Sequence, residues 1–181
     1  ALGSTSLAFF VSLNLIVFFD ETFSGFQFKE YFMWTPSFQF ALGVDGLSLY
    51  LIILTTFLFP VCVLIAWSAV KTYAKEYFIA LLLLESFLIA VFTLLDLFLF
   101  YIAFEATLLP MFFIVGVWGS RSRRINAAYQ LFLYTLFGSV FMLIGILYIW
   151  YTTGTTNYEI LSQTSFSSSD QIFLWLAFFL S

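Results

Sequence analysis

Two glutamates, Glu85 and Glu105, stand inside long apolar stretches and are the residues of this sequence best suited to chemistry. An acid at bilayer depth is costly enough that it marks a functional site by default. Glu85 precedes Asp96 by eleven residues and Glu105 follows it by nine. A helical rise of about 1.5 Å per residue then puts both carboxyls roughly 13–17 Å from a turn at Asp96. The two acids are therefore predicted at matching depth, near the middle of a membrane.

Acids at matching depth on neighbouring antiparallel helices can transfer protons, either as a relay or by sharing one proton, because burial and like charge both disfavour ionisation. The alternative is that each carboxyl stays protonated, or pairs with a polar group on a helix outside these residues. Pro110 favours Glu105 as the active member. It has no N–H for the carbonyl of Ala106, so backbone polarity is left free one residue past Glu105. Glu105 is the first candidate for proton transfer, and Glu85 is a candidate relay.

The rest of the composition excludes several classes of site. The chain has no histidine and a single cysteine, Cys62, which excludes zinc and haem sites, disulfide scaffolds and histidine-dependent nucleophilic catalysis. A net charge of −4 leaves no basic field for nucleic acid. We expect no bound cofactor and no metal.

The elements that hold the two glutamates are predicted to be membrane helices. Hydrophobic residues make up 63% of the 181 residues and charged residues 9%, against roughly 45–50% and 25% in soluble domains. A span needs about 20 apolar residues, and the continuous apolar runs lack the alternation of a transmembrane β-barrel. The fold class is therefore all-α, a polytopic bundle of four complete spans within 46–151. These spans are 46–67, 77–95, 97–118 and 127–151.

Both ends of the chain resemble parts of further spans. Residues 1–19 are expected to form a membrane span that is already apolar at Ala1, and residues 171–181 are expected to form the start of another span. Loops are expected at 20–45 and 152–170, which are rich in Gly, Ser, Thr and Asn. We therefore expect the chain to be the N-terminal portion of a longer membrane protein.

Several other residues are interpreted as structural. Asp45 is expected to cap the helix that follows it, and Asp96 is expected to be solvated at its turn. Pro60 frees the carbonyl of Thr56, a loss that the neighbouring threonine hydroxyls are expected to repair. Gly138, beside Ser139 in mid-span, should allow a neighbouring helix to approach closely.

Charge placement orients the bundle. We call the side with 20–45, the turn at Asp96 and 152–170 the acidic side, and the side with 68–76 and 119–126 the basic side. The basic side holds five of the six basic residues, and only Lys29 lies opposite. The five are Lys71, Lys75, Arg121, Arg123 and Arg124. By the positive-inside rule the basic side faces a bacterial cytoplasm or a mitochondrial matrix. The arginines at 121, 123 and 124 are expected to anchor the orientation and to contact anionic lipid, for example cardiolipin.

Several blocks, in this order, resemble subunit 4 of respiratory complex I, the proton-pumping NADH:ubiquinone oxidoreductase. They are GVDGLSLYLIILTTFLFP at 43–60, KEYFIALLLLE at 75–85, FYIAFEATLLPMFFIVGVWG at 100–119 and AAYQLFLYTLFGSVFMLIGILY at 127–148. This family is shared with multi-subunit cation/proton antiporters. The resemblance implies an antiporter-like inverted-repeat fold and a non-redox subunit that translocates protons beside other complex I membrane subunits. It also implies a multi-pass protein of the mitochondrial inner membrane, with 20–45 on the intermembrane-space side.

The resemblance assigns the family's membrane glutamate to Glu105, within FEATLLP, and implies a partner lysine on a later, broken helix. In the family the segment similar to LWLAFFLS runs on into that lysine, whereas this sequence ends at Ser181. We expect the lysine from a second polypeptide, as from a fragmented gene, or from an unrepresented remainder of the same subunit. Glu85 matches a position that is not uniformly acidic in the family. Two alternatives stay open: a subunit of a sodium/proton antiporter, or a scaffold with no transport role.

Overall fold

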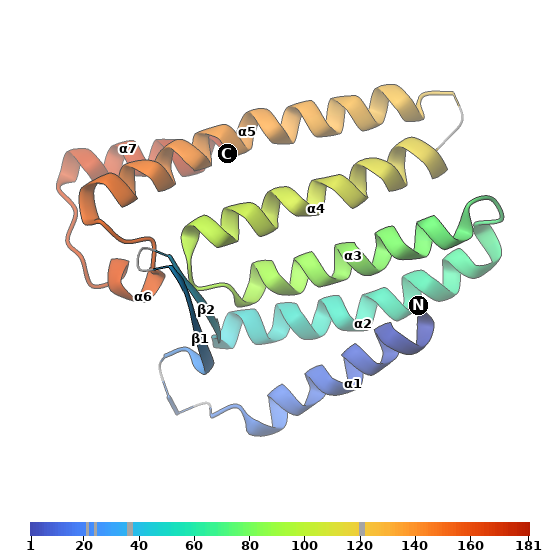
Figure 1. Ribbon diagram of the computed structural model, residues 1–181, viewed down its shortest axis with the longest axis horizontal. Helices are drawn as coiled ribbons and strands as arrows, with labels where there is room; N and C mark the ends of the chain where they lie inside the picture. The colour runs from blue at the N-terminus through green and yellow to red at the C-terminus, as the bar shows by residue number, and fades with distance from the viewer. Residues whose placement is uncertain (21, 24, 36–37, 120–121) are drawn as a thin grey trace.

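The computed structural model describes residues 1–20, 22–23, 25–35, 38–119 and 122–181 (Figure 1). Helices dominate these residues, and two strands interrupt them near the N-terminus. In chain order the elements are α1 (Leu2–Phe18), β1 (Gln27–Thr35), β2 (Phe38–Val44), α2 (Gly46–Ala69), α3 (Ala74–Thr93), α4 (Leu97–Trp118), α5 (Arg124–Thr153), α6 (Tyr158–Leu161) and α7 (Ser168–Leu180).

The long helices form an antiparallel row in which each helix packs against its neighbour in the chain. Contacts join α1 to α2, α2 to α3, α3 to α4, α4 to α5, and α5 to α7. Figure 1 shows α1 to α5 side by side, with the hairpin and α6 at the left-hand end of the helices. That end is the acidic side. The row therefore places the two glutamate-bearing helices, α3 and α4, at its centre.

Among the described residues, four helices are long and apolar enough to cross a membrane: α2, α3, α4 and α5, of 24, 20, 22 and 30 residues. Their windows have mean hydropathies of 1.9 to 2.6. The predicted class, a polytopic helical bundle with four complete spans, is confirmed. α1 and α7 are shorter apolar helices.

A β-hairpin occupies much of 20–45, where the sequence analysis expects a loop. β1 and β2 pair antiparallel, with Phe32 opposite Phe40 and Tyr31 opposite Ala41. The alternating apolar positions of FQFALGV are the signal for a strand, which the surrounding polar residues obscured. Ala41 is fully buried, and its carbonyl accepts a hydrogen bond of 2.9 Å from the amide of Leu95. The hairpin is therefore fastened to the turn between α3 and α4.

Aspartates begin two of the long helices. Asp45 accepts a 2.7 Å hydrogen bond from the amide of Ser48 at the start of α2. Asp96 accepts 2.9 and 3.1 Å bonds from the amides of Phe98 and Leu99 at the start of α4. Asp96 is only 2% exposed, so the expectation that it is solvated is wrong. The hairpin and the 152–170 segment fold over its turn, which the local sequence does not reveal.

Hydroxyl groups join α1 to α2 within the apolar layer. The hydroxyls of Ser12 and Thr56 lie 2.8 Å apart in a buried contact. Thr56 also donates to the carbonyl of Ile52, and Thr55 to that of Leu51. These carbonyls lie one turn before the one that Pro60 frees, so the threonine hydroxyls do not make the predicted local repair. They serve helix packing instead.

Candidate functional site

Glu105 lies near the middle of α4, nine residues past the cap at Asp96. Its side chain is half-buried, and its Oε1 atom is buried with no hydrogen-bond partner among the described residues. A buried polar atom without a partner costs about 1–3 kcal/mol, and more when the group is charged. Such an atom in the middle of a span is a place where a proton, a water molecule or a cation would be stabilised.

Tyr101 and Ser139 complete a polar cluster around this carboxyl. Tyr101 lies one turn before Glu105 on the same face of α4, and its phenol interacts with the carboxyl and with the hydroxyl of Ser139 on α5. Ser139 is only 1% exposed and donates a 3.0 Å bond to the carbonyl of Leu136. Tyr101 is not among the candidates that the sequence pattern indicates, and the pattern favours a packing role for Ser139. The four-residue spacing from Tyr101 to Glu105 is the signal that could have found the tyrosine.

The end of α7 lies against α5 next to this cluster. A Cβ atom added at Gly138 would lie 2.6 Å from the carbonyl oxygen of Ser181. About two helix turns further along α5, Gly145 faces Ala177 and Phe178. Small residues at these positions let the two backbones approach closely. The structure therefore places Ser181 beside the residue that precedes Ser139.

Pro110 lies inside α4, five residues beyond Glu105, and is buried. Because proline lacks an N–H, the carbonyl of Ala106 has no i+4 donor in the helix. The nearby hydroxyl of Thr107 bonds instead to the carbonyl of Phe104, at 2.7 Å. A helix carbonyl without its usual i+4 donor thus follows Glu105 directly.

Glu85 occupies a different environment on α3. It is only 5% exposed, and its Oε1 also has no hydrogen-bond partner in the part of the chain that the structure describes. Its spacing of four from Leu81 puts it close to the face of α3 whose residues pack against Phe59 and Val63 of α2. Within the described part of the chain no hydrogen bond joins the two carboxyls. Glu85 thus lies near the face of α3 that packs on α2, whereas Glu105 lies near Ser139 of α5.

The start of α4 is fixed on the acidic side through Asp96. The Thr156 hydroxyl donates a 2.6 Å bond to Asp96 Oδ2, and the amide of Leu97 donates to the Thr156 carbonyl at 3.0 Å. The amide of Tyr158 bonds in turn to the carbonyl of Leu95 at 2.8 Å. The segment after α5 is thereby fastened to the helix that carries Glu105.

The hairpin makes a second connection to this segment. Lys29 forms an ion pair with Glu159, and the Tyr31 hydroxyl donates a 2.9 Å bond to the same carboxylate. The hydrogen bond from Lys29 is the main reason that the pKa of Glu159 lies below its ordinary value. The same bond raises the pKa of Lys29. The single basic residue of the acidic side is thus used to hold the hairpin against α6.

The basic side contains Lys71, Lys75, Arg123 and Arg124, whereas Arg121 lies outside the described residues. None of these four forms an ion pair within the part of the chain that the structure describes. Arg124 Nη1 donates a 2.7 Å hydrogen bond to the carbonyl of Val117 near the end of α4.

Comparisons with known proteins agree with this architecture. Residues 95–181, which include Glu105 but not Glu85, match the family described as NADH:quinone oxidoreductase/Mrp antiporter, TM. NADH-ubiquinone oxidoreductase chain 4 of Arabidopsis thaliana is 54% identical over 182 residues, covering 99% of this chain and 37% of that protein. The same chain of Chondrus crispus is 52% identical, over 100% of this chain and 37% of the relative.

Over its whole length this chain is similar to part of NADH-ubiquinone oxidoreductase chain 4. It spans 37% of the length of these curated relatives. Respiratory complex I from Thermus thermophilus contains a chain with the same fold, at a TM-score of 0.80 and 27% identity, matched over 99% of this chain and 37% of that one. An archaeal membrane-bound sulfane sulfur reductase shares the fold alone, at a TM-score of 0.78 and 17% identity, over 99% of this chain and 28% of that one. The molecule is a multi-pass, antiporter-like membrane subunit.

Proposed function

We propose that this chain moves protons across a membrane as a non-redox subunit of an NADH:ubiquinone oxidoreductase, with Glu105 as the group that binds the proton. The observation that carries the proposal is the buried, unpaired Oε1 of Glu105 within a polar cluster in mid-span. A carboxyl in hydrocarbon keeps its proton until water or a cation reaches it, and then ionises. Alternation between these states loads and releases one proton.

The cation is proposed to be a lysine from the segment that follows LWLAFFLS in the family. The packing of Ser181 against Gly138 supports this, because a chain continuing from there would start beside Ser139 and the Glu105 cluster. A carboxyl and an amine at close range can exchange between an ion pair and a neutral pair, which moves a proton. The remaining helices would come from a second polypeptide or from the rest of the same subunit, beside the other membrane subunits of complex I.

Glu85 is proposed as a relay that exchanges protons with Glu105 through water or through a side chain of a neighbouring subunit. Its unpaired, buried Oε1 supports a role in proton transfer. Because no hydrogen bond joins the two carboxyls within the described residues, this exchange requires an intermediary rather than direct contact.

The proposed location is the mitochondrial inner membrane, with the basic side in the matrix and the hairpin in the intermembrane space. The distribution of lysines and arginines supports this orientation. Contact of Arg123 and Arg124, and of Arg121, with cardiolipin is part of the same proposal.

The test is Glu105→Gln in the assembled complex, reconstituted in vesicles, with NADH oxidation and proton uptake measured together. We expect proton uptake per NADH to fall while the complex still assembles. Glu30→Gln, an exposed acid of the hairpin, is the matched control and should leave the ratio unchanged. An unchanged ratio in Glu105→Gln would instead favour a scaffold role, with Glu105 inherited but idle.

A second candidate is a subunit of a sodium/proton antiporter, which the matched family description also includes. Purification from native membranes separates the two. A flavin and iron–sulfur arm in the same particle supports the oxidoreductase, and a particle without it supports the antiporter.

A further inference from the structure

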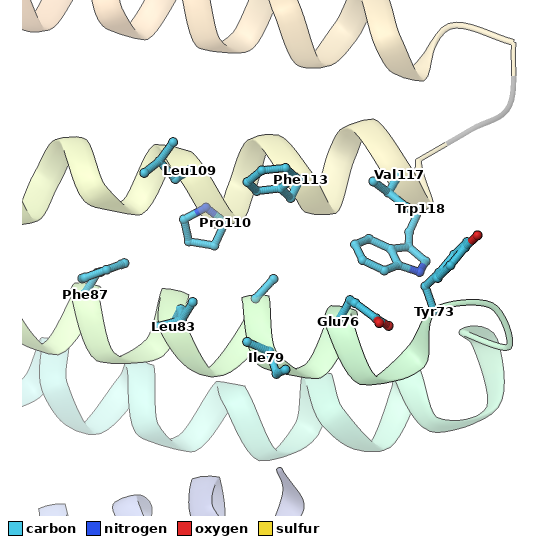
Figure 2. Close-up of a pocket in the computed structure, with 11 residues that line it drawn as sticks. Tyr73, Glu76, Ile79, Leu83, Phe87, Leu109, Pro110, Phe113, Val117 and Trp118 are labelled. Carbon is cyan, nitrogen blue, oxygen red and sulfur yellow. The ribbon is translucent and has the colours of Figure 1, made fainter.

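A long groove lies on the surface between α3 and α4 (Figure 2). Its volume is about 730 Å³, and most of its lining is apolar. Leu83, Leu109 and Phe113 line it and are 46%, 56% and 54% exposed. In Figure 2, Tyr73 and Glu76 lie together at one end, beside Trp118. That end opens at the basic side, so the groove is polar only at the membrane surface.

The length of the groove fits one leaflet of a bilayer. Along α3 it runs from Glu76 to Phe87, eleven residues that rise about 16 Å at 1.5 Å each. This is about half of the ~30 Å hydrocarbon core. A transmembrane helix would need a complementary face through both leaflets. An acyl chain anchored at the basic-side surface needs only one, which makes a lipid the better occupant.

A second cavity, of about 550 Å³, adjoins the polar end of the groove. Both are lined by Val117 and Trp118, and the second cavity is also lined by Lys71 and Arg124. The indole Nε1 of Trp118 donates a 2.8 Å hydrogen bond to the carbonyl of Thr72. The indole of Trp118, which this hydrogen bond holds in place, therefore separates the apolar groove from the basic cavity.

The charge around this opening favours an anion. The described residues of the basic side include the four basic side chains Lys71, Lys75, Arg123 and Arg124, against one acid, Glu76. No ion pair neutralises any of the four within the described residues. Each lysine or arginine near the surface adds about 1 kcal/mol to the attraction of an anionic lipid.

We propose that the groove and the adjoining cavity together form a site for an anionic phospholipid of the basic-side leaflet. Its phosphate lies at Lys71 and Arg124, and one acyl chain lies between α3 and α4 as far as Pro110. The acyl chain covers the exposed Leu83 and Leu109 and keeps hydrocarbon against this side of α4. The site does not depend on the role of Glu105.

The test uses the whole membrane complex, reconstituted in phosphatidylcholine vesicles that carry a photoactivatable lipid with a diazirine in its acyl chain. We expect a phosphatidylglycerol probe to label peptides 79–87 and 109–117 more strongly than a phosphatidylcholine probe does. Lys71→Gln should lower labelling by the phosphatidylglycerol probe about fivefold, the loss of one charge's contribution. It should leave phosphatidylcholine labelling unchanged.

A second variant places a larger side chain in the groove. Leu83→Trp should reduce labelling of both peptides, whereas Ile65→Trp, at a 66% exposed position of α2, should not. The proposal would be overturned if the two probes labelled these peptides equally and Lys71→Gln did not change that labelling. Adducts spread evenly over all exposed helix faces would overturn it as well, because they would indicate bulk lipid.

Discussion

Thr156 donates a 2.6 Å hydrogen bond to the buried carboxylate of Asp96, sixty residues earlier in the chain. The same carboxylate caps α4 through the amides of Phe98 and Leu99. One side chain therefore both begins the helix that carries Glu105 and joins it to the segment between α5 and α7.

Thr156→Val should destabilise this connection. The change removes a donor from a buried, charged acceptor, a loss of about 1–3 kcal/mol. Thermal unfolding of the purified complex should begin at a lower temperature in this variant. Thr152→Val, whose hydroxyl bonds only to carbonyls of its own helix in the described structure, is the control. Equal unfolding temperatures in the two variants would contradict the assigned role of Thr156.

The contact of the hairpin with α6 should depend on pH. The pKa of Glu159 is lowered from 4.5 in the folded protein, so its contribution is complete above that value and is lost as the pH falls through the lowered pKa. The pKa of Lys29 is raised from 10.5, so its contribution is complete below 10.5 and is lost as the pH rises through the raised pKa. Between these limits the hairpin is held most firmly.

Limited proteolysis of 20–45 across a pH series measures this effect. Cleavage should be slowest between the two limits and should accelerate towards either. In Glu159→Gln the acid-side acceleration should disappear, because the titrating carboxyl is gone. A variant profile that still accelerates in acid would assign the effect to another group.

Gly138→Ala should disturb the packing of α7 on α5. The new methyl would lie 2.6 Å from the carbonyl oxygen of Ser181, and overpacking of this kind costs about 1–3 kcal/mol. Gly3→Ala is a matched change in α1, where no atom lies within 4 Å of the added carbon. Thermal stability of the complex should fall in the first variant only. Equal stability in both would show that α7 moves aside at no cost.

Ser12→Ala should weaken the association of α1 with α2. It removes the buried contact with the Thr56 hydroxyl, and hydrogen bonds between membrane helices contribute about 0.6 kcal/mol on average and up to about 1.7. Unfolding in mixed detergent micelles would measure the change. Ser86→Ala, which removes an exposed hydroxyl bonded to its own helix, should have a smaller effect, and the reverse order would contradict the assignment.

Much of the fold follows from the sequence because membrane helices carry a strong local signal. The four long helices and their antiparallel order follow from apolar length and from the polar segments between the apolar runs. The hairpin was not predicted, since its strand signal is short and lies among turn-forming residues.

The surroundings of the acids were harder to predict, because they depend on contacts between helices. Apolar patterning does not say which face of α3 meets α2, so the different neighbours of Glu85 and Glu105 appear only in the structure. Tyr101 was missed because a tyrosine near a span end is ordinarily assigned to the membrane interface. The burial of Asp96 likewise depends on Thr156, which is distant in sequence.

The row of helices, in which neighbours in space are neighbours in the chain, has a consequence for biogenesis. Each antiparallel pair can form as soon as its second member enters the bilayer, because its contacts need no later part of the polypeptide. The bonds from Asp96 to Thr156 and from Lys29 to Glu159 join residues 60 and 130 positions apart. Insertion can thus proceed pair by pair along the chain, and these two bonds close only after translation has passed residues 156 and 159, respectively.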